Sequence, residues 1–272
     1  MFDENQGTLR YVSAHWPQYV AGVTTGVGLL VLLWVSAQEG WWGFVPMGIG
    51  VLIILLYFMG ASLWAARERF DDPQVDAAEL FYGLGRLRPD DNILHVELGE
   101  RTLPLKLMRK LVSGRLTVVD VYTPQVMPSP SIPRWRQLAP PYDKDPRVVW
   151  RSGSIDLLPL PDASVFAVTM HGVLSNIEQE GDRQRLLEEV YRVLRPGGRL
   201  LLAEQTRTQV NWLVMGMTAV RLPDVNYWRQ LLQKADLKIV EEVNVKGLIT
   251  FFRADKITAG VGRQLPFEWS GD

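Results

Sequence analysis

Cysteine is missing from the 272-residue sequence, and histidine occurs only three times, as His15, His95 and His171. The absence of cysteine excludes disulfides, cysteine-ligated zinc, iron–sulfur clusters and thiol catalysis. Because the three histidines lie far apart in the sequence, we expect no metal site. The formal net charge is −1. The basic excess typical of proteins that bind nucleic-acid phosphates is therefore lacking, and we expect no nucleic-acid partner.

Charged residues are also scarce in the first quarter of the chain. No Asp, Glu, Lys or Arg occurs from residue 11 to 38 or from residue 40 to 66. About 20 apolar residues are enough to cross the hydrocarbon core of a bilayer. We therefore predict a transmembrane helical hairpin over residues 19–66, preceded by an N-terminal arm over residues 1–18. A signal peptide is the competing interpretation of the first run, but a second span follows it directly.

The basic residues that flank the two spans predict the orientation of the hairpin. Its turn contains no Lys or Arg, whereas Arg10 precedes the first span and Arg67 and Arg69 follow the second. Basic residues favour the cytoplasmic side. We expect a two-pass protein of the inner or cytoplasmic membrane, with both termini and the large domain in the cytoplasm. The small residues Gly22 and Gly26 predict close helix packing, either with the second span or with a partner helix.

The remainder of the chain alternates between apolar β-type runs and helical patterns. Strands are predicted at 93–98, 116–122, 164–170, 199–204, 238–245 and 248–254. Helices are predicted at 75–87, 104–111, 183–194 and 225–235. This alternation predicts an α/β domain over residues 67–256 with a doubly wound, mostly parallel sheet, followed by a C-terminal tail over residues 257–272. Ligands bind such sheets at the carboxyl ends of the strands.

Three phrases carry a family resemblance. Residues 88–99 read RPDDNILHVELG, residues 153–164 read GSIDLLPLPDAS, and residues 186–204 read LLEEVYRVLRPGGRLLLAE. Together they resemble the class I S-adenosylmethionine-dependent methyltransferases, in the branch that includes quinone and small-molecule enzymes. The resemblance covers residues 75–256 and implies a seven-stranded methyltransferase-like sheet.

The resemblance also assigns cofactor-binding positions. It places Glu97 and Gly99 at the turn after the first strand, and Asp120 at the end of the second strand, where an acid accepts the ribose hydroxyls. Ser154 and Ile155 stand at the third contact, where the family usually has an acid. The resemblance identifies no catalytic residue.

Two positions depart from the family pattern. Arg101 and Leu103 stand where the family has further glycines, so both are candidates to block the cofactor site by bulk, and Arg101 also by charge. We therefore expect a pseudoenzyme without cofactor, which serves as a scaffold or accessory subunit. Its hairpin would bind other integral-membrane subunits of a larger complex, with respiratory or photosynthetic complexes as candidates.

Two other functions remain open. One is an active S-adenosylmethionine-dependent methyltransferase acting on a lipid-soluble acceptor such as a quinone, lipid or pigment intermediate. The other is a module that binds a different, anionic ligand at Arg101.

Three further features bear on partners and acceptor. Six prolines between residues 127 and 146 predict an extended loop in place of the family's helix. This loop would either face a partner or the membrane, with Arg134, Trp135 and Arg136 as contacts, or be solvated. The apolar segment 210–220 would cover the acceptor site, or press on the bilayer or a neighbouring subunit. His171 would either line an acceptor pocket or be a hydrogen-bonded structural residue.

Overall fold

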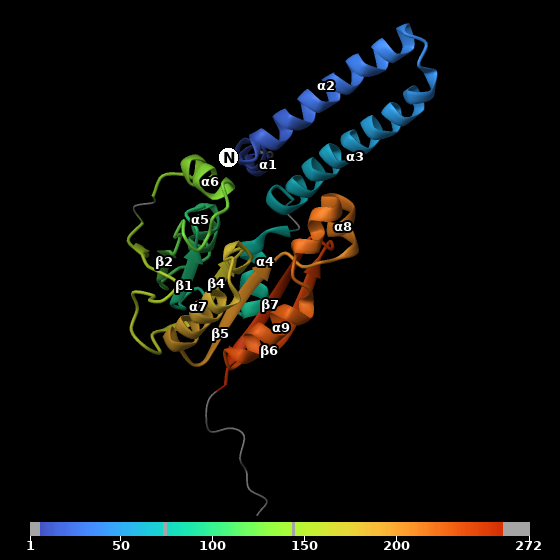
Figure 1. Cartoon of the computed structure of the whole chain (residues 1–272). Helices are drawn as coiled ribbons and strands as arrows, with labels where there is room; N and C mark the ends of the chain where they lie inside the picture. The colour runs from blue at the N-terminus through green and yellow to red at the C-terminus, as the bar shows by residue number, and fades with distance from the viewer. Residues whose placement is uncertain (1–5, 73–74, 143–144, 258–272) are drawn as a thin grey trace, which may run out of the picture.

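The computed structural model describes residues 6–72, 75–142 and 145–257. The predicted C-terminal tail therefore lies outside the described residues, apart from Ile257. Two apolar helices project from an α/β domain, and two short helices, over Gln6–Ala14 and Ser131–Leu138, lie at their base (Figure 1).

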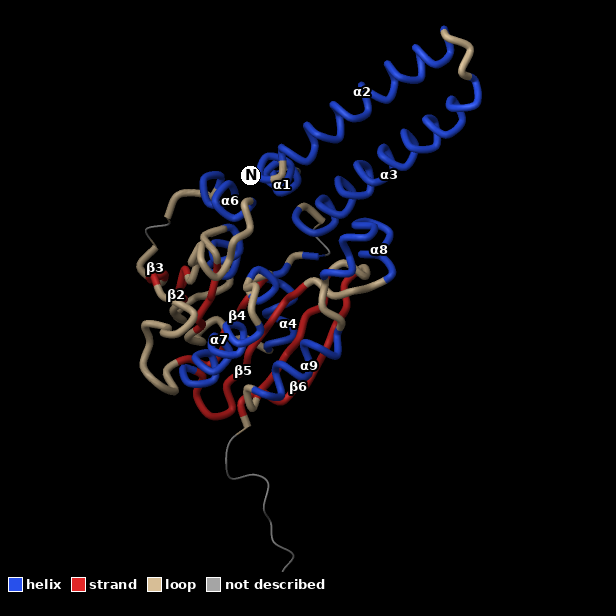
Figure 2. The backbone as a smooth tube through the Cα atoms, viewed as in Figure 1, coloured by secondary structure: helices blue, strands red, loops and turns tan. Residues whose placement is uncertain are grey.

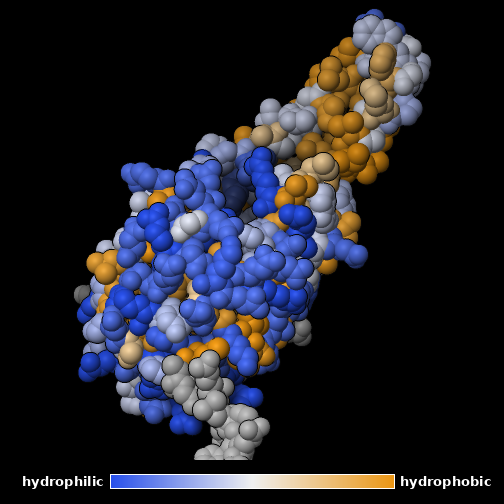
Figure 3. Space-filling model, turned by 60° about the horizontal axis from the view of Figure 1, so that its bottom comes forward, coloured by the Kyte–Doolittle hydropathy of each residue, from blue (hydrophilic) through white to orange (hydrophobic). Residues whose placement is uncertain are grey.

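The projecting hairpin consists of α2 (Trp16–Gln38) and α3 (Val45–Phe70), joined by the 3-10 helix η1 (Trp42–Phe44). Both helices are long and apolar enough to cross a membrane. Their exposed side chains form the hydrophobic surface in Figure 3, above a mainly hydrophilic domain. A Cβ added at Gly22 would lie only 3.0 Å from the Met59 sulfur of α3, so the absence of a side chain lets the two helices approach closely. The predicted small-residue packing against the second span of the same chain is thereby confirmed.

A short amphipathic helix, α1 (Gln6–Ala14), precedes the hairpin and is fixed to its base. The Asp71 carboxylate, which follows α3, accepts hydrogen bonds from the backbone N–H groups of Gly7 and Thr8, both at 2.8 Å. These N–H groups belong to the first turn of α1, where no carbonyl of the helix can accept them and where a negative charge is favoured. Asp71 thus joins the end of the second apolar helix to the start of α1.

The sheet has seven strands in the order β3-β2-β1-β4-β5-β7-β6. The strands are β1 (Ile93–Glu97), β2 (Leu116–Asp120), β3 (Val148–Ser152), β4 (Val165–His171), β5 (Leu194–Glu204), β6 (Leu237–Val245) and β7 (Ile249–Lys256). The first five are parallel, and β7 is antiparallel to both β5 and β6. The sheet is therefore mixed, and the prediction of a mostly parallel, doubly wound sheet is confirmed (Figure 2).

Helices cover both faces of the sheet. They are α4 (Ala77–Gly85) and α5 (Thr102–Met108) on one face, and α7 (Glu180–Val193) and α9 (Val225–Lys234) on the other. Phe81 and Leu107 belong to one buried cluster, whereas Leu186 and Trp228 belong to the other. Burial of these apolar faces drives the two layers onto the sheet.

The proline-rich crossover differs from its prediction as an extended loop, because α6 (Ser131–Leu138) forms within it. Pro130 is the residue that precedes the helix, and Pro133 lies in its first turn. N–H groups at these positions have no partner inside a helix, so proline costs no hydrogen bond there. The prediction was therefore wrong because it counted prolines without considering their positions.

The apolar segment 210–220 is also helical, as α8 (Gln209–Met215) followed by the 3-10 helix η4 (Gly216–Arg221). Val214 packs with Ala65 of α3 and with Leu248. Gly216 lies directly against the Phe58 ring, which is further along α3. The segment therefore covers the base of α3.

A further 3-10 turn, η3 (Leu174–Asn176), follows β4 on the pocket side.

Candidate functional site

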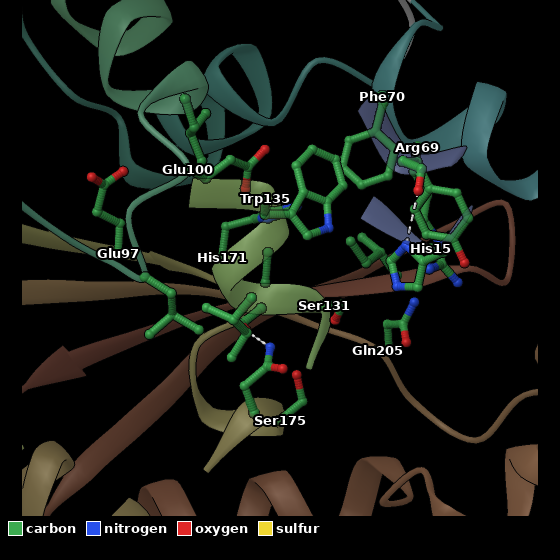
Figure 4. Close-up of a pocket in the computed structure, with 18 of the residues that line it drawn as sticks. His15, Arg69, Phe70, Glu97, Glu100, Ser131, Trp135, His171, Ser175 and Gln205 are labelled. Atoms are coloured by element: carbon green, nitrogen blue, oxygen red, sulfur yellow. Dashed lines mark hydrogen bonds between the residues drawn. The ribbon is translucent and has the colours of Figure 1, made fainter. Parts of the chain in front are cut away.

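A cavity of about 220 Å³ lies at the carboxyl ends of β1, β4 and β5 (Figure 4). It lies where ligands bind in doubly wound sheets. Its lining is formed by Tyr11, His15, Arg69, Phe70, His95, Glu97, Leu98, Glu100, Leu103, Ser131, Ile132, Trp135, His171, Gly172, Ser175, Asn176, Ala203, Gln205 and Ile249. The lining thus combines strand ends of the α/β domain with α1, α6 and the end of α3.

Aromatic rings from three helices form the roof of this pocket. Tyr11 of α1, Phe70 of α3 and Trp135 of α6 are mutual neighbours, with ring centroids 5.4 to 6.5 Å apart. The Arg134 guanidinium donates to the backbone oxygen of Ala14 at 3.2 Å and so holds α6 against α1. The base of the apolar hairpin is therefore part of the pocket wall.

The turn after β1 contains the first two residues assigned to the cofactor. The Glu97 carboxylate accepts a hydrogen bond from the backbone N–H of Arg101 at 2.8 Å. Burial raises the pKa of Glu97 to about 8. Gly99 has a φ of +89°, a conformation that favours glycine. The turn thus keeps its acid and its obligatory glycine.

Asp120, at the end of β2, forms an ion pair with an arginine of α6. Arg136 Nη1 lies 2.7 Å from Asp120 Oδ2 and also donates to the backbone oxygen of Leu98 at 2.9 Å. A Cβ added at Gly99 would collide with the same guanidinium. Arg136 therefore lies across the strand ends that the resemblance assigns to the cofactor.

The two candidate blocking residues do not cover Gly99. Arg101 adopts a left-handed φ of +60°, and its guanidinium donates to the backbone oxygen of Pro140 at 3.2 Å and to the Tyr142 hydroxyl at 3.0 Å. It stacks on the Tyr142 ring. Leu103 is buried in the core between α4, α5 and the sheet, and one edge of it lines the pocket. The side chain over Gly99 belongs to Arg136, so the blocking role of Arg101 and Leu103 stays a prediction.

Ser154 and Ile155 lie in a short turn after β3. The Ser154 hydroxyl accepts from the backbone N–H of Leu157 at 3.2 Å, and Ile155 is buried in the core. The serine hydroxyl is thus used inside its own turn. A cofactor role for these two residues also stays a prediction.

All three histidines line the same pocket, although they are far apart in the sequence. Burial lowers the pKa of His171 to about 4, with a further contribution from the charge of Arg69. Burial lowers the pKa of His95 to about 3, and its ring bonds to Thr169. Both are therefore neutral at pH 7. Within the described ranges, no three His, Asp or Glu side chains are arranged to hold a metal ion.

Two polar residues, one in the pocket wall and one beside it, were not recognised in the sequence. The Glu204 carboxylate accepts from the backbone N–H of Leu174 at 2.8 Å and thereby holds η3 beside the pocket. Burial raises its pKa to about 7. Arg69 projects from the end of α3 into the pocket wall. In the sequence, Arg69 stands out only as a basic residue that flanks the second span, because nothing local indicates its contact with Asn211 of α8, 142 residues away.

Comparison with known proteins gives matches to the α/β domain. Residues 99–202 match the family model described as "Methyltransferase domain". A demethylmenaquinone methyltransferase of Symbiobacterium thermophilum is 29% identical over 162 residues, which are 59% of this chain and 58% of that protein. The ubiquinone/menaquinone biosynthesis C-methyltransferase UbiE of a Ruegeria species is 29% identical over 117 residues, 43% of each protein. The chain thus spans about half the length of the curated relatives it matches.

The solved structures give the same fold. A SAM-dependent methyltransferase from Aquifex aeolicus superposes with a TM-score of 0.53 and 18% identity, over 69% of this chain and 95% of that chain. At this identity the likeness shows the fold alone.

Proposed function

Because the domain that follows the hairpin belongs to the class I S-adenosylmethionine-dependent methyltransferase family, we propose that the chain is an active methyltransferase with a lipid-soluble acceptor. The observation that carries this proposal is the pocket at the ends of β1, β4 and β5, whose roof includes the base of an apolar helix long enough to cross a membrane. The naming of the relatives as methyltransferases favours this reading over the pseudoenzyme that the glycine replacements predicted.

Three of the positions assigned to the cofactor keep the residue types of the family. Glu97 and Asp120 end two adjacent strands, and Gly99 provides the tight turn between β1 and α5. These residues would hold S-adenosylmethionine, with Ser154 and Ile155 at the adenine end. When bound, the cofactor supplies a methyl group on a positively charged sulfur.

Arg136 must release Asp120 before the cofactor can bind. The side chains of this ion pair are 28% and 21% exposed. A pair of this kind contributes about 1 kcal/mol or less. Micromolar binding provides about 8 kcal/mol. The ion pair therefore lowers the affinity for cofactor without preventing binding.

The acceptor side of the pocket supports an apolar substrate. Tyr11, Phe70 and Trp135 form an aromatic roof, and Phe70 is the last residue of α3. An acceptor dissolved in the bilayer would therefore reach the pocket along the base of the hairpin. The names of these relatives support a quinone-type acceptor for this chain.

The membrane arrangement follows from the same helices. We propose that α2 and α3 cross the cytoplasmic membrane and that the α/β domain lies on the cytoplasmic side, where the flanking arginines favour it. The exposed apolar side chains of α8 and η4 would rest at the bilayer surface beside α3. Other integral-membrane subunits would bind the outer face of the hairpin.

A scaffold without cofactor is the second candidate, and the occupation of Asp120 by Arg136 favours it. Titration calorimetry of S-adenosylmethionine and S-adenosylhomocysteine with the full chain in detergent separates the two. We expect micromolar binding by the wild type and about fivefold tighter binding by Arg136→Gln, which frees Asp120. Arg229→Gln, which removes a comparable ion pair with Glu242 away from the pocket, should leave the affinity unchanged.

No binding by either the wild type or Arg136→Gln at millimolar ligand, from folded protein, would overturn the enzyme proposal. In that case the scaffold function stands, and the proteins that co-purify with the hairpin become the next measurement.

A further inference from the structure

Arg69 is the one Arg or Lys residue among those that line the pocket in the described part of the chain. Its Nη2 donates to the side-chain oxygen of Asn211 at 3.2 Å. The side-chain oxygen of Gln205 also accepts from the guanidinium. The Nε atom of Arg69 is buried and has no hydrogen-bond partner.

The partners of this guanidinium are neutral. No carboxylate of residues 6–72, 75–142 or 145–257 lies within ion-pair distance of Arg69. A charge enclosed without a counter-charge is unfavourable unless something completes it. The planar guanidinium is suited to an oxygen anion, because its parallel N–H groups match two lone pairs.

The groups around Arg69 do not supply that anion. In Figure 4, Arg69, His15 and Gln205 lie on one side of the pocket, whereas Glu97 and Glu100 lie on the other. His171, between the two sides, is neutral at pH 7, as its lowered pKa shows. Burial also lowers the pKa of His15. The positive charge on this side of the pocket is therefore not balanced by a facing acid.

The shape of the pocket adds a second requirement. The rings of Tyr11, Phe70 and Trp135 form one wall. Aromatic walls favour planar rings, which stack on them or meet them edge to face. A planar ring with a negatively charged oxygen satisfies both the rings and the arginine.

We propose that Arg69, at the end of a membrane-crossing helix, binds an ionised oxygen of a planar aromatic methyl acceptor and so selects the anionic form of that acceptor. The inference rests on the proposed function, since it assigns this pocket to the acceptor. The same chemistry has a second source, the amino-acid carboxylate of S-adenosylmethionine, and the experiment distinguishes the two.

The test uses 2-naphthol as the probe, because its neutral and ionised forms absorb at different wavelengths, and 2-methoxynaphthalene as a matched probe that cannot ionise. Both are titrated against the full chain in detergent, without methyl donor, across a pH series. The proteins are the wild type, Arg69→Gln, Arg69→Lys and the control Arg67→Gln. Arg67 is exposed and lies two residues before Arg69 on α3. Circular dichroism and Tm establish that each variant is folded.

We expect the wild type to bind the ionised probe about tenfold to a hundredfold more tightly than the neutral one. The pKa of bound 2-naphthol should then lie about one to two units below its value in detergent alone, because each tenfold preference for the ionised form corresponds to one pKa unit. Arg69→Gln should lose this preference but keep its affinity for 2-methoxynaphthalene. Arg69→Lys should retain part of it, and Arg67→Gln all of it.

The proposal is wrong if bound 2-naphthol titrates on the wild type as it does in detergent alone, or if neither probe binds. It is also wrong if Arg69→Gln weakens both probes equally. Should Arg69→Gln fail to fold, the wild-type titration and Arg69→Lys still decide.

A second arm compares S-adenosylhomocysteine with 5′-methylthioadenosine, which lacks the carboxylate. Loss of that preference in Arg69→Gln, with an unchanged naphthol titration, would assign Arg69 to the methyl donor instead. If the protein binds neither donor analogue, only this second arm is affected. That result would count against the proposed function and would leave the naphthol titration as the test of Arg69.

Discussion

At the scale of single residues, the site depends on acids whose charge is set by burial. Glu97 is the clearest case, because it lies at the end of a fully buried strand and has a pKa of about 8. Its ordinary pKa is 4.5. The folded protein therefore holds this proton more tightly than the unfolded chain does. Between these two pH values the unfolded chain loses its proton first, so stability falls as the pH rises.

Glu97→Gln should remove this pH dependence while its amide oxygen still accepts from the Arg101 N–H. We expect the substitution to stabilise the protein relative to wild type at pH 8, on the order of 4 kcal/mol, and to have little effect at pH 4. Thermal unfolding of the full chain in detergent from pH 4 to pH 8 measures it. The pKa of Glu204 is also raised, so Glu204 makes stability fall with rising pH in both the wild type and Glu97→Gln. The exposed control Glu188→Gln should follow the wild type, and a similar curve for Glu97→Gln would contradict the argument.

At the scale of elements, the segment formed by α8 and η4 connects the α/β domain to the hairpin. It buries Val214 against α3, but it leaves Leu213 and Met217 exposed, the latter at 80%. Large apolar side chains gathered beside a membrane-crossing helix are typical of contact with lipid. The segment is too short to cross the bilayer. It therefore fits a position at the bilayer surface.

A spin label on Met217→Cys tests this position, and the cysteine-free sequence ensures that only the introduced residue is labelled. In vesicles of phosphatidylcholine and phosphatidylglycerol, we expect this label to be relaxed more by oxygen, which concentrates in lipid, than by a water-soluble nickel chelate. Val240→Cys, an exposed residue of β6, should show the opposite order. Equal responses at the two sites would exclude lipid contact by α8 and η4.

At the scale of the whole molecule, the hairpin is structurally joined to the pocket. Lys246, in the turn between β6 and β7, forms ion pairs with Glu68 and Asp72 at the base of α3. Asp71 holds α1, and α1 in turn contacts α6. Removal of the hairpin should therefore open the roof of the pocket, which a simple membrane tether would not do.

The orientation of the whole protein is tested by labelling single cysteines in intact bacteria with a membrane-impermeant maleimide. Glu39→Cys lies in the turn between α2 and α3, and Glu188→Cys lies on the exposed face of α7. We expect Glu39→Cys to react in intact cells and Glu188→Cys to react only after permeabilisation, because basic residues flank the cytoplasmic ends of the spans. The reverse pattern would show that the domain is external.

The sequence by itself determined the elements whose signals are local. Uncharged runs of sufficient length predicted the apolar hairpin, and alternating strand and helix patterns predicted the doubly wound sheet. β3 carried no clear signal, because its side chains are partly exposed at the edge of the sheet. The helix α6 was missed because prolines are compatible with a first helical turn.

Only the tertiary structure decided which side chains meet at the site. Arg136 contacts Asp120 across 16 residues, and Arg69 contacts Asn211 across 142. No periodicity or spacing encodes such contacts, since they arise when separate elements pack on one sheet. Nothing in the local sequence favours Arg136 over Arg101 as the residue above Gly99. That choice depends on the direction in which α6 crosses the strand ends, and so on the packing of α6 against α1 and the base of the hairpin.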